Sequence, residues 1–290
     1  MMFGLHNALA RLMADTEKPS PVASVLNPDS LPLGSNFVAV GPSRSTDGAT
    51  RVCINSHQPW TGPVAWYEAH LISEEGQNIY GGLFAGSPVI FLGHNENIAW
   101  GHTVNQPDLV DTFELELNPE NENQYKIDGE WLELERRLAP LEIRLWRDFR
   151  WTVNREVLYS IFGPAMRVNG RVFAVRYAGI GEFRQTEQWY RMGRAQSLEQ
   201  FKDAMRIQAL AMFNTGYGDR DGNIFYAYNA LLPERADGHD WSGTVPGNTR
   251  DTLWTEYRPF DQLPIVENPK SGFIQNCNSD PFRTSIGGDN

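Results

Sequence analysis

Cysteine, basic clusters and long apolar runs are scarce in this sequence of 290 residues, and each scarcity excludes a class of protein. Two cysteines, Cys53 and Cys277, exclude a disulfide framework and a four-cysteine zinc site; whether they pair stays open. The net charge of −11, without any basic stripe, argues against nucleic acid or an anionic membrane as a partner. No apolar run reaches the ~18 residues of a membrane span. The motifs H-E-x-x-H and G-x-S-x-G are missing, so a zinc or triad hydrolase has little support.

The amino terminus combines a short apolar segment with a proline-rich stretch. Residues 3–13 carry apolar side chains at helical spacing, but His6, Asn7 and Arg11 interrupt them and no basic region precedes them. This pattern predicts one short helix rather than a signal peptide, so the compartment stays open. Residues 18–33 contain four prolines and no periodicity, which is typical of an exposed linker accessible to cleavage.

Ser35 follows this linker in the tripeptide Gly34-Ser35-Asn36, which opens an apolar segment at residues 37–40. A cut before Ser35 would create an N-terminal serine, whose free α-amine takes the hydroxyl proton directly or through one water. Such a nucleophile needs no distant histidine. The alternative is that the tripeptide is an ordinary junction between a loop and a strand.

Several motifs follow Ser35 in a fixed order. They are Asn55-Ser56-His57-Gln58-Pro59-Trp60, Trp66-Tyr67-Glu68-Ala69-His70-Leu71, Gly93-His94-Asn95-Glu96-Asn97-Ile98-Ala99-Trp100-Gly101-His102-Thr103-Val104, Asp108-Leu109-Val110-Asp111 and Gln275-Asn276-Cys277-Asn278. With Gly34-Ser35-Asn36, this ordered set resembles the start of the β-chain of the penicillin acylase family, over roughly residues 33–290. The family includes acyl-homoserine lactone acylases and aculeacin-type lipopeptide acylases.

The resemblance implies an α+β fold rich in strands, namely part of the αββα sandwich of N-terminal nucleophile hydrolases. Members cleave themselves and then hydrolyse the amide between an acyl group and an amine, as in penicillins, acyl-homoserine lactones or lipopeptides. They have a separate α-chain and further β-chain. We therefore interpret residues 1–34 as the end of the α-chain with its spacer and residues 35–290 as an incomplete N-terminal part of the β-chain. We expect this fragment to be inactive alone; the family is commonly periplasmic or secreted.

The resemblance also implies roles for four residues. Ser35 is the nucleophile, and the backbone N–H of Val104 and the side-chain amide of Asn278 are donors to the oxyanion. His57 stands where lactone and aculeacin acylases have histidine, which favours aliphatic or long acyl groups, and would tune the amine of Ser35. The alternatives are a capped turn at Asn278 and a satisfied core histidine at His57. No residue after Asn278 matches the arginine that orients this asparagine in the family.

No cofactor is required for this chemistry, but the resemblance implies a structural calcium site. Asp108, Val110 and Asp111 match a place where some members bind calcium through two carboxylates and a backbone carbonyl, which suit a hard cation. Asp289 lies where another ligand would fall, and a glutamate is expected from the α-chain. The alternative is an acidic loop before a strand.

Two other polar patterns are interpreted as structural. Residues 219–223 resemble the start of a calcium loop, but the twelfth position is Ala230, so we predict a hairpin turn. Four histidines lack the compact spacing of zinc ligands and are expected to be structural: His57, His70, His94 and His102.

Downstream of Ser35 the pattern predicts mainly strands. Residues 37–40 and 51–55 are expected to form a hairpin around Asp47-Gly48. If Gly41 pairs with Arg51, Ser35 pairs with His57. Further strands are predicted at residues 88–92, 113–117, 143–146, 172–177 and 224–229, and a helix at residues 198–210 with Ser197 as its cap.

The sequence thus predicts an amidohydrolase that forms an acyl-enzyme on Ser35. The alternative is a non-catalytic, β-rich binding or interaction fragment that keeps the scaffold. Cleavage between Gly34 and Ser35 would distinguish the two, because a binding module has no reason to cut itself.

Overall fold

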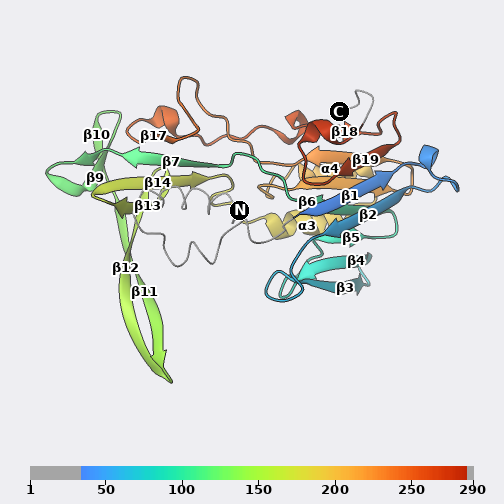
Figure 1. Cartoon of the computed structure of the whole chain (residues 1–290), viewed down its shortest axis with the longest axis horizontal. Helices are drawn as coiled ribbons and strands as arrows, with labels where there is room; N and C mark the ends of the chain where they lie inside the picture. The colour runs from blue at the N-terminus through green and yellow to red at the C-terminus, as the bar shows by residue number, and fades with distance from the viewer. Residues whose placement is uncertain (1–33, 286–290) are drawn as a thin grey trace. The chain divides into compact units, whose positions relative to one another are not determined.

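The structure, a computed structural model, describes residues 34–285 (Figure 1). These residues form two compact units. The Asp111 unit comprises residues 108–180 and 233–257, and the Ser35 unit comprises residues 34–107, 181–232 and 258–285. The helix and linker predicted before residue 34, and Asp289, lie outside the described residues.

Two antiparallel sheets build the Ser35 unit. The larger sheet has the strand order β18-β16-β15-β6-β5-β4-β3, and the smaller one has the order β19-β1-β2. The larger sheet consists of β3 (Trp66–Ser73), β4 (Gln77–Phe84), β5 (Leu92–His94), β6 (Ile98–Thr103), β15 (Asn214–Asp219), β16 (Ile224–Tyr228) and β18 (Ile265–Glu267). The smaller sheet consists of β1 (Ser35–Val40), β2 (Arg51–Ser56) and β19 (Phe273–Asn276).

The two sheets pack face to face. The apolar residues between them are Phe37, Ala39 and Ile274 from the smaller sheet and Ile224, Tyr226 and Val266 from the larger sheet. The larger sheet carries two paired glycines that face the smaller sheet, Gly216 on β15 opposite Phe37 and Gly101 on β6 opposite Ile54. A Cβ on Gly216 would lie 2.1 Å from the Phe37 ring, so glycine is required for this close approach. Because these glycines have no side chains, the smaller sheet, which contains Ser35, packs closely against the larger sheet.

Helices α3 (Gln185–Arg194) and α4 (Leu198–Met205) cover the other face of the larger sheet. Trp100 and Tyr217 alternate with the two glycines along β6 and β15, and successive strand residues point to opposite faces. Both aromatic residues pack with Met192 of α3 and Phe201 of α4 in the main core. The Ser35 unit therefore has three layers: helices, the larger sheet and the smaller sheet.

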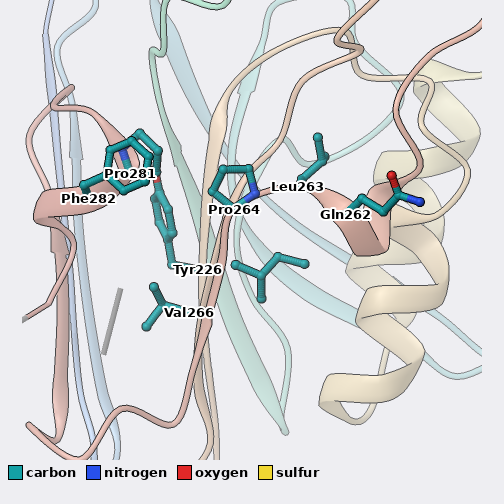
Figure 2. Close-up of a pocket in the computed structure, with 8 residues that line it drawn as sticks. Tyr226, Gln262, Leu263, Pro264, Val266, Pro281 and Phe282 are labelled. Atoms are coloured by element: carbon teal, nitrogen blue, oxygen red, sulfur yellow. The ribbon is translucent and has the colours of Figure 1, made fainter. Parts of the chain in front are cut away.

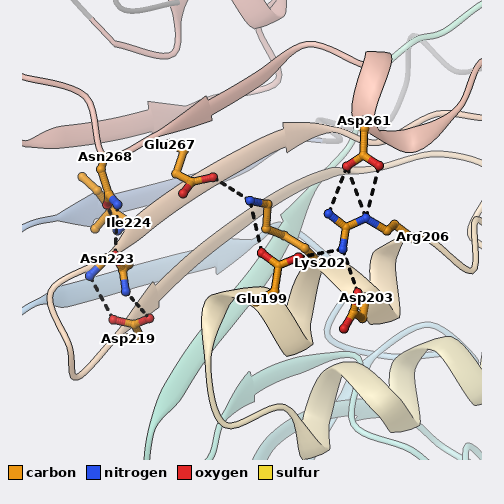
Figure 3. A network of polar contacts seen from close by, with 10 residues as sticks. All are labelled: Glu199, Lys202, Asp203, Arg206, Asp219, Asn223, Ile224, Asp261, Glu267 and Asn268. Atoms are coloured by element: carbon orange, nitrogen blue, oxygen red, sulfur yellow. Dashed lines mark hydrogen bonds and ion pairs between the residues drawn. The ribbon is translucent and has the colours of Figure 1, made fainter.

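Polar contacts attach α4 to this framework (Figure 3). Lys202 lies 2.8 Å from Glu267 of β18, and Arg206 lies 3.2 Å from Asp261. At the end of β15, the Asp219 carboxylate accepts the backbone N–H groups of residues 221 and 223 at 3.0 and 2.9 Å. The hairpin turn predicted at residues 219–223 is confirmed, because β15 pairs with β16 across it.

The Asp111 unit contains two more sheets. One has the order β11-β12-β13-β14-β7-β17, in which only β17 and β7 are parallel, and the other has the order β10-β9-β8. Their strands are β7 (Val110–Leu115), β8 (Leu117–Asn118), β9 (Asn121–Ile127), β10 (Glu130–Glu133), β11 (Glu135–Trp146), β12 (Phe149–Ser160), β13 (Gly163–Val168), β14 (Arg171–Tyr177) and β17 (Thr244–Pro246). Their core includes Phe113, Tyr125 and Phe162. The hairpin of β11 and β12 extends beyond this core, and most of its residues are exposed (Figure 1).

Most predicted elements are confirmed, with corrections. The strands at residues 37–40, 51–55, 172–177 and 224–229 are present, while those at 113–117 and 143–146 overlap β7, β8 and the longer β11. The strand at 88–92 is wrong except for Leu92, because Ser87 accepts the N–H of Val89 and turns the chain. The helix begins after Ser197 as predicted but ends at Met205, and α3 was not predicted.

The predicted register of the first hairpin is wrong by one residue. Val40 pairs with Arg51 and Ser35 pairs with Ser56, rather than Ser35 with His57. The cause is Gly41, whose N–H donates to the Gly272 carbonyl at 2.9 Å instead of continuing the pair with β2.

Within residues 34–285, no helix has both the length and the apolar character needed to cross a bilayer.

Candidate active site around Ser35

Ser35 begins β1 and is 4% exposed. Its hydroxyl donates to the carbonyl oxygen of Gly34 at 2.6 Å, and its backbone N–H donates to Asn278 Oδ1 at 2.5 Å. Both contacts lie on the peptide bond that joins Gly34 to Ser35. The predicted nucleophile is therefore held directly against the bond that it is predicted to cut.

The Gly34 carbonyl has a second donor, the backbone N–H of His57 at 3.0 Å. The imidazole Nε2 of His57 is 3.3 Å from Nδ2 of both Asn36 and Asn55. A Cβ on Gly34 would lie 3.1 Å from His57 Nδ1 and 3.3 Å from Asn278 Oδ1. His57 thus belongs to the same cluster as Ser35, and its hydrogen bond to the Gly34 carbonyl comes from its backbone. A role for the imidazole stays a prediction.

Val104 and Asn278 meet at the ends of two strands, β6 and β19. Asn278 adopts φ +66°, a conformation that asparagine tolerates better than most residues. Its Nδ2 donates to the Val104 carbonyl at 2.7 Å. The two predicted oxyanion donors are neighbours, but in this uncut chain the Asn278 amide is directed at Val104.

Behind these residues lies a polar network that the sequence did not reveal. Asn276 is fully buried, and its Oδ1 accepts the backbone N–H of Asn278 at 2.9 Å and the hydroxyl of Thr103 at 2.6 Å. Asn214 and Tyr226 extend the network into the larger sheet. Of these residues only Tyr226 lies in a predicted strand, at residues 224–229, and the strands that carry Thr103, Asn214 and Asn276 were not predicted.

His102 lies on β6 but faces helix α3. Its Nε2 accepts the indole N–H of Trp189 at 3.2 Å, and Nδ1 lies 3.1 Å from Thr215 Oγ1. Burial lowers the pKa of His102 to about 4, so the imidazole is neutral near pH 7. Among the residues that the structure describes, no three His, Cys, Asp or Glu side chains are arranged to hold a metal ion.

The predicted calcium ligands lie in the Asp111 unit, where Val110 begins β7. Asp111 is buried, and its Oδ2 accepts from Arg235 Nε at 2.8 Å and from Trp254 Nε1 at 2.6 Å. Its other oxygen, Oδ1, is buried with no hydrogen-bond partner among the described residues. Asp108 lies 3.3 Å from the same Arg235. Burial raises the pKa of Asp111, and Arg235 opposes that rise. A calcium ion here stays a prediction: one carboxylate oxygen is free to bind it, while a guanidinium already offsets part of the charge.

A cavity of about 270 Å³ lies elsewhere in the Ser35 unit, beside β16 and β18 (Figure 2). Its lining is mainly apolar and consists of Tyr226, Gln262, Leu263, Pro264, Ile265, Val266, Pro281 and Phe282. None of the four predicted catalytic residues lines it. The cavity therefore does not identify the acyl site.

Comparison with known proteins connects this site to a fold and a family. The solved structure of a thermostable penicillin G acylase from Alcaligenes faecalis superposes with a TM-score of 0.75 at 26% identity, over 88% of this chain and 46% of the other. The helix, sheet and sheet layers thus belong to an N-terminal nucleophile hydrolase fold, and the β-rich α+β prediction is confirmed.

Sequence comparison then defines the family: residues 2–288 match the penicillin amidase family model, and the chain belongs to that family. It is 30% identical to the acyl-homoserine lactone acylase PvdQ of Pseudomonas fluorescens (strain Pf0-1) over 79% of this chain, and 30% identical to the penicillin G acylase of Escherichia coli over 86%. The chain spans 29% of the length of each of these two relatives. The family resemblance inferred from the motifs is confirmed.

Proposed function

We propose that this chain supplies the nucleophile of an amidohydrolase that removes an acyl group from an amine. The observation that carries the proposal is the Gly34–Ser35 peptide bond, with the Ser35 hydroxyl 2.6 Å from the Gly34 carbonyl oxygen. The relatives named acylases support the class of reaction. Ser35, His57, Val104 and Asn278 keep the roles predicted from the sequence.

The first step is self-cleavage. The Ser35 hydroxyl oxygen attacks the Gly34 carbonyl carbon, the C–N bond breaks, and the hydroxyl proton passes to the Ser35 nitrogen, which becomes an α-amine. Negative charge develops on the Gly34 oxygen, where the His57 N–H lies at 3.0 Å. Water then hydrolyses the ester and releases a chain that begins with Ser35.

The second step is hydrolysis of the substrate. The free amine takes the Ser35 hydroxyl proton as the oxygen attacks the substrate carbonyl carbon, the amide C–N bond breaks, and the proton passes to the departing amine. Water then attacks the ester on Ser35, which releases the carboxylic acid and restores the hydroxyl. Val104 N–H and Asn278 Nδ2 would stabilise the oxyanion. Because Asn278 Nδ2 donates to the Val104 carbonyl in the uncut chain, this amide must turn toward the substrate after cleavage. Before cleavage the Ser35 nitrogen is an amide and cannot act as a base.

The proposed substrates are acyl amides of the penicillin, acyl-homoserine lactone or lipopeptide type. Relatives are named for penicillin G and for acyl-homoserine lactones. The histidine at position 57 favours substrates with an aliphatic or long acyl group. Apolar pockets separate neighbouring chain lengths by only ~1–3 kcal/mol per methylene, so a range of acyl lengths is expected.

We also propose a structural calcium ion at Asp108, Val110 and Asp111. The buried and unpartnered Asp111 Oδ1 supports this, since carboxylate oxygens suit calcium. The ion would strengthen the Asp111 unit and take part in no chemical step.

The test measures the turnover of penicillin G and of an N-acyl-homoserine lactone by three preparations. They are the chain alone, a complete protein in which the chain is expressed together with an α-chain and the rest of the β-chain, and that complete protein with Ser35→Ala. We expect turnover only in the complete wild-type protein, because this chain covers only 29% of the length of each of the two relatives. Equal turnover in the Ser35→Ala protein would contradict the proposed nucleophile. Complete absence of turnover and of self-cleavage would favour the binding-fragment alternative.

A further inference from the structure

A buried polar network lies between the two sheets, directly behind the candidate site. Its four side chains come from β6, β15, β16 and β19, and each residue is at most 1% exposed: Thr103, Asn214, Tyr226 and Asn276. Buried polar groups cost free energy unless they are hydrogen-bonded, and networks of them are sensitive to the loss of any member. The position of each group in this network therefore depends on the others.

Tyr226 fixes the orientation of the Asn214 amide. Its hydroxyl donates to Asn214 Oδ1 at 2.6 Å, and burial raises the pKa of Tyr226, so the hydroxyl keeps its proton. With Oδ1 engaged, Asn214 Nδ2 faces the other way and donates to Thr103 Oγ1 at 3.0 Å and to Asn276 Oδ1 at 3.1 Å. Without the hydroxyl, the amide is free to turn and to present an acceptor where Asn276 needs a donor.

The network ends on the residues that flank Ser35. Asn276 Oδ1 accepts the backbone N–H of Asn278 at 2.9 Å, where Asn278 has φ +66°. Asn214 Nδ2 also lies 3.4 Å from the Val104 carbonyl. Since Asn278 accepts the N–H of Ser35, a shift of Asn276 is transmitted to the nucleophile.

We infer that Asn214 and Tyr226 are positioning residues, which act through Asn276 to hold Asn278 and Val104 in place for oxyanion stabilisation. The inference rests on the proposed function. Loss of one oxyanion donor lowers kcat by about 10²–10³. A donor that is misplaced rather than lost should cost less, so we expect kcat to fall about tenfold with little change in KM.

The test is Tyr226→Phe in the complete enzyme, with p-nitrophenyl octanoate as the probe. The matched control is Tyr217→Phe, because Tyr217 is equally buried but its hydroxyl donates at 2.9 Å to Asp219, in the turn after β15. Both variants lose one buried hydroxyl, so both should lose similar thermal stability. Only Tyr226→Phe should lose kcat, while Tyr217→Phe should stay within about twofold of wild type.

A double-mutant cycle separates positioning from a structural role. In an Asn278→Ala background, Tyr226→Phe should cause a much smaller further loss, because one of the two donors that it positions is gone. Equal kcat values for the two Tyr→Phe variants, or a full additional loss in that background, would overturn the inference.

Two further variants complete the design. If Tyr226→Phe does not fold, Asn214→Asp keeps the side-chain volume and should show the same fall in kcat at unchanged KM; an unchanged kcat would overturn the inference. Ser35→Ala tests the proposed function separately. Turnover by Ser35→Ala would refute that function, whereas inactive Ser35→Ala with wild-type kcat in Tyr226→Phe would refute the positioning role alone.

Discussion

Gly216→Ala should destabilise the Ser35 unit and slow self-cleavage together. The added Cβ would lie 2.1, 2.2 and 2.4 Å from three atoms of the Phe37 ring. Ordinary carbon contacts begin near 3.5 Å, so the ring must retreat by roughly 1.5 Å. Phe37 is 1% exposed between the sheets, and it lies two residues from Ser35 on the same face of β1. The ring can move only if the strand moves with it.

The expected magnitude follows from these contacts. Overpacking a core costs about 1–3 kcal/mol, which exceeds the ~0.5–1 kcal/mol that alanine gains over glycine in a strand. Each 1 kcal/mol lowers Tm by about 2–4 °C in a protein of 150–250 residues. A shift of about 1 Å at the reacting atoms can cost about 10² in rate, so cleavage at Ser35 should slow at least tenfold.

The assay is thermal unfolding together with the rate of self-cleavage, both measured on the full-length protein. Gly243→Ala is the matched control, because no atom lies within 4 Å of its added Cβ and its backbone is not strained. The control should stay within about 0.5 kcal/mol of wild type. Wild-type stability and cleavage in Gly216→Ala would refute the close packing of the two sheets at Phe37.

Three other predictions concern single groups. Asn278→Ala in the processed enzyme should lower kcat by about 10²–10³ with the fold intact, and unchanged turnover would transfer the oxyanion role to another residue. Because the folded pKa of His102, about 4, is below its usual value near 6.5, the unfolded state binds the proton more readily, and the free energy of unfolding should fall as pH drops from 6.5 to 4 by about 3 kcal/mol. Denaturation curves across this range should lose that slope in His102→Gln, and an unchanged slope would contradict the buried neutral imidazole. Calcium at 100 times its Kd should stabilise the wild type by about 2.7 kcal/mol and so raise its Tm, but it should not raise the Tm of Asp111→Asn. An unchanged Tm in both proteins would argue for the acidic-loop alternative.

Local chemistry made much of the fold predictable. Ser197 caps α4 and the Asp219 turn joins β15 to β16, and both depend on side chains that can be recognised in the sequence. Helix α3 escaped prediction because its N-cap, Arg184, makes no side-chain capping bond. The end of α4 was misplaced because a distant side chain, Gln188, accepts the N–H groups of residues 209 and 210.

Only those residues of the candidate site that lie in recognisable motifs could be predicted from the sequence. The motifs named Ser35, His57, Val104 and Asn278, and the structure places all four in one unit. The donor to the Gly34 carbonyl is the backbone N–H of His57, and a backbone donor cannot be recognised from the residue type. The network through Asn214 depends on which strands become neighbours, and sequence periodicity does not determine that order.

The central claim is that Ser35 becomes an N-terminal nucleophile, and the intact mass of the full-length gene product tests it most directly. We expect two fragments in the wild type, one of them beginning with Ser35, and a single uncut chain in folded Ser35→Ala. After brief incubation with an acyl substrate, the added acyl mass should lie on the fragment that begins with Ser35. A natively folded wild type that stays uncut, or cleavage at the same rate in Ser35→Ala, would contradict the account.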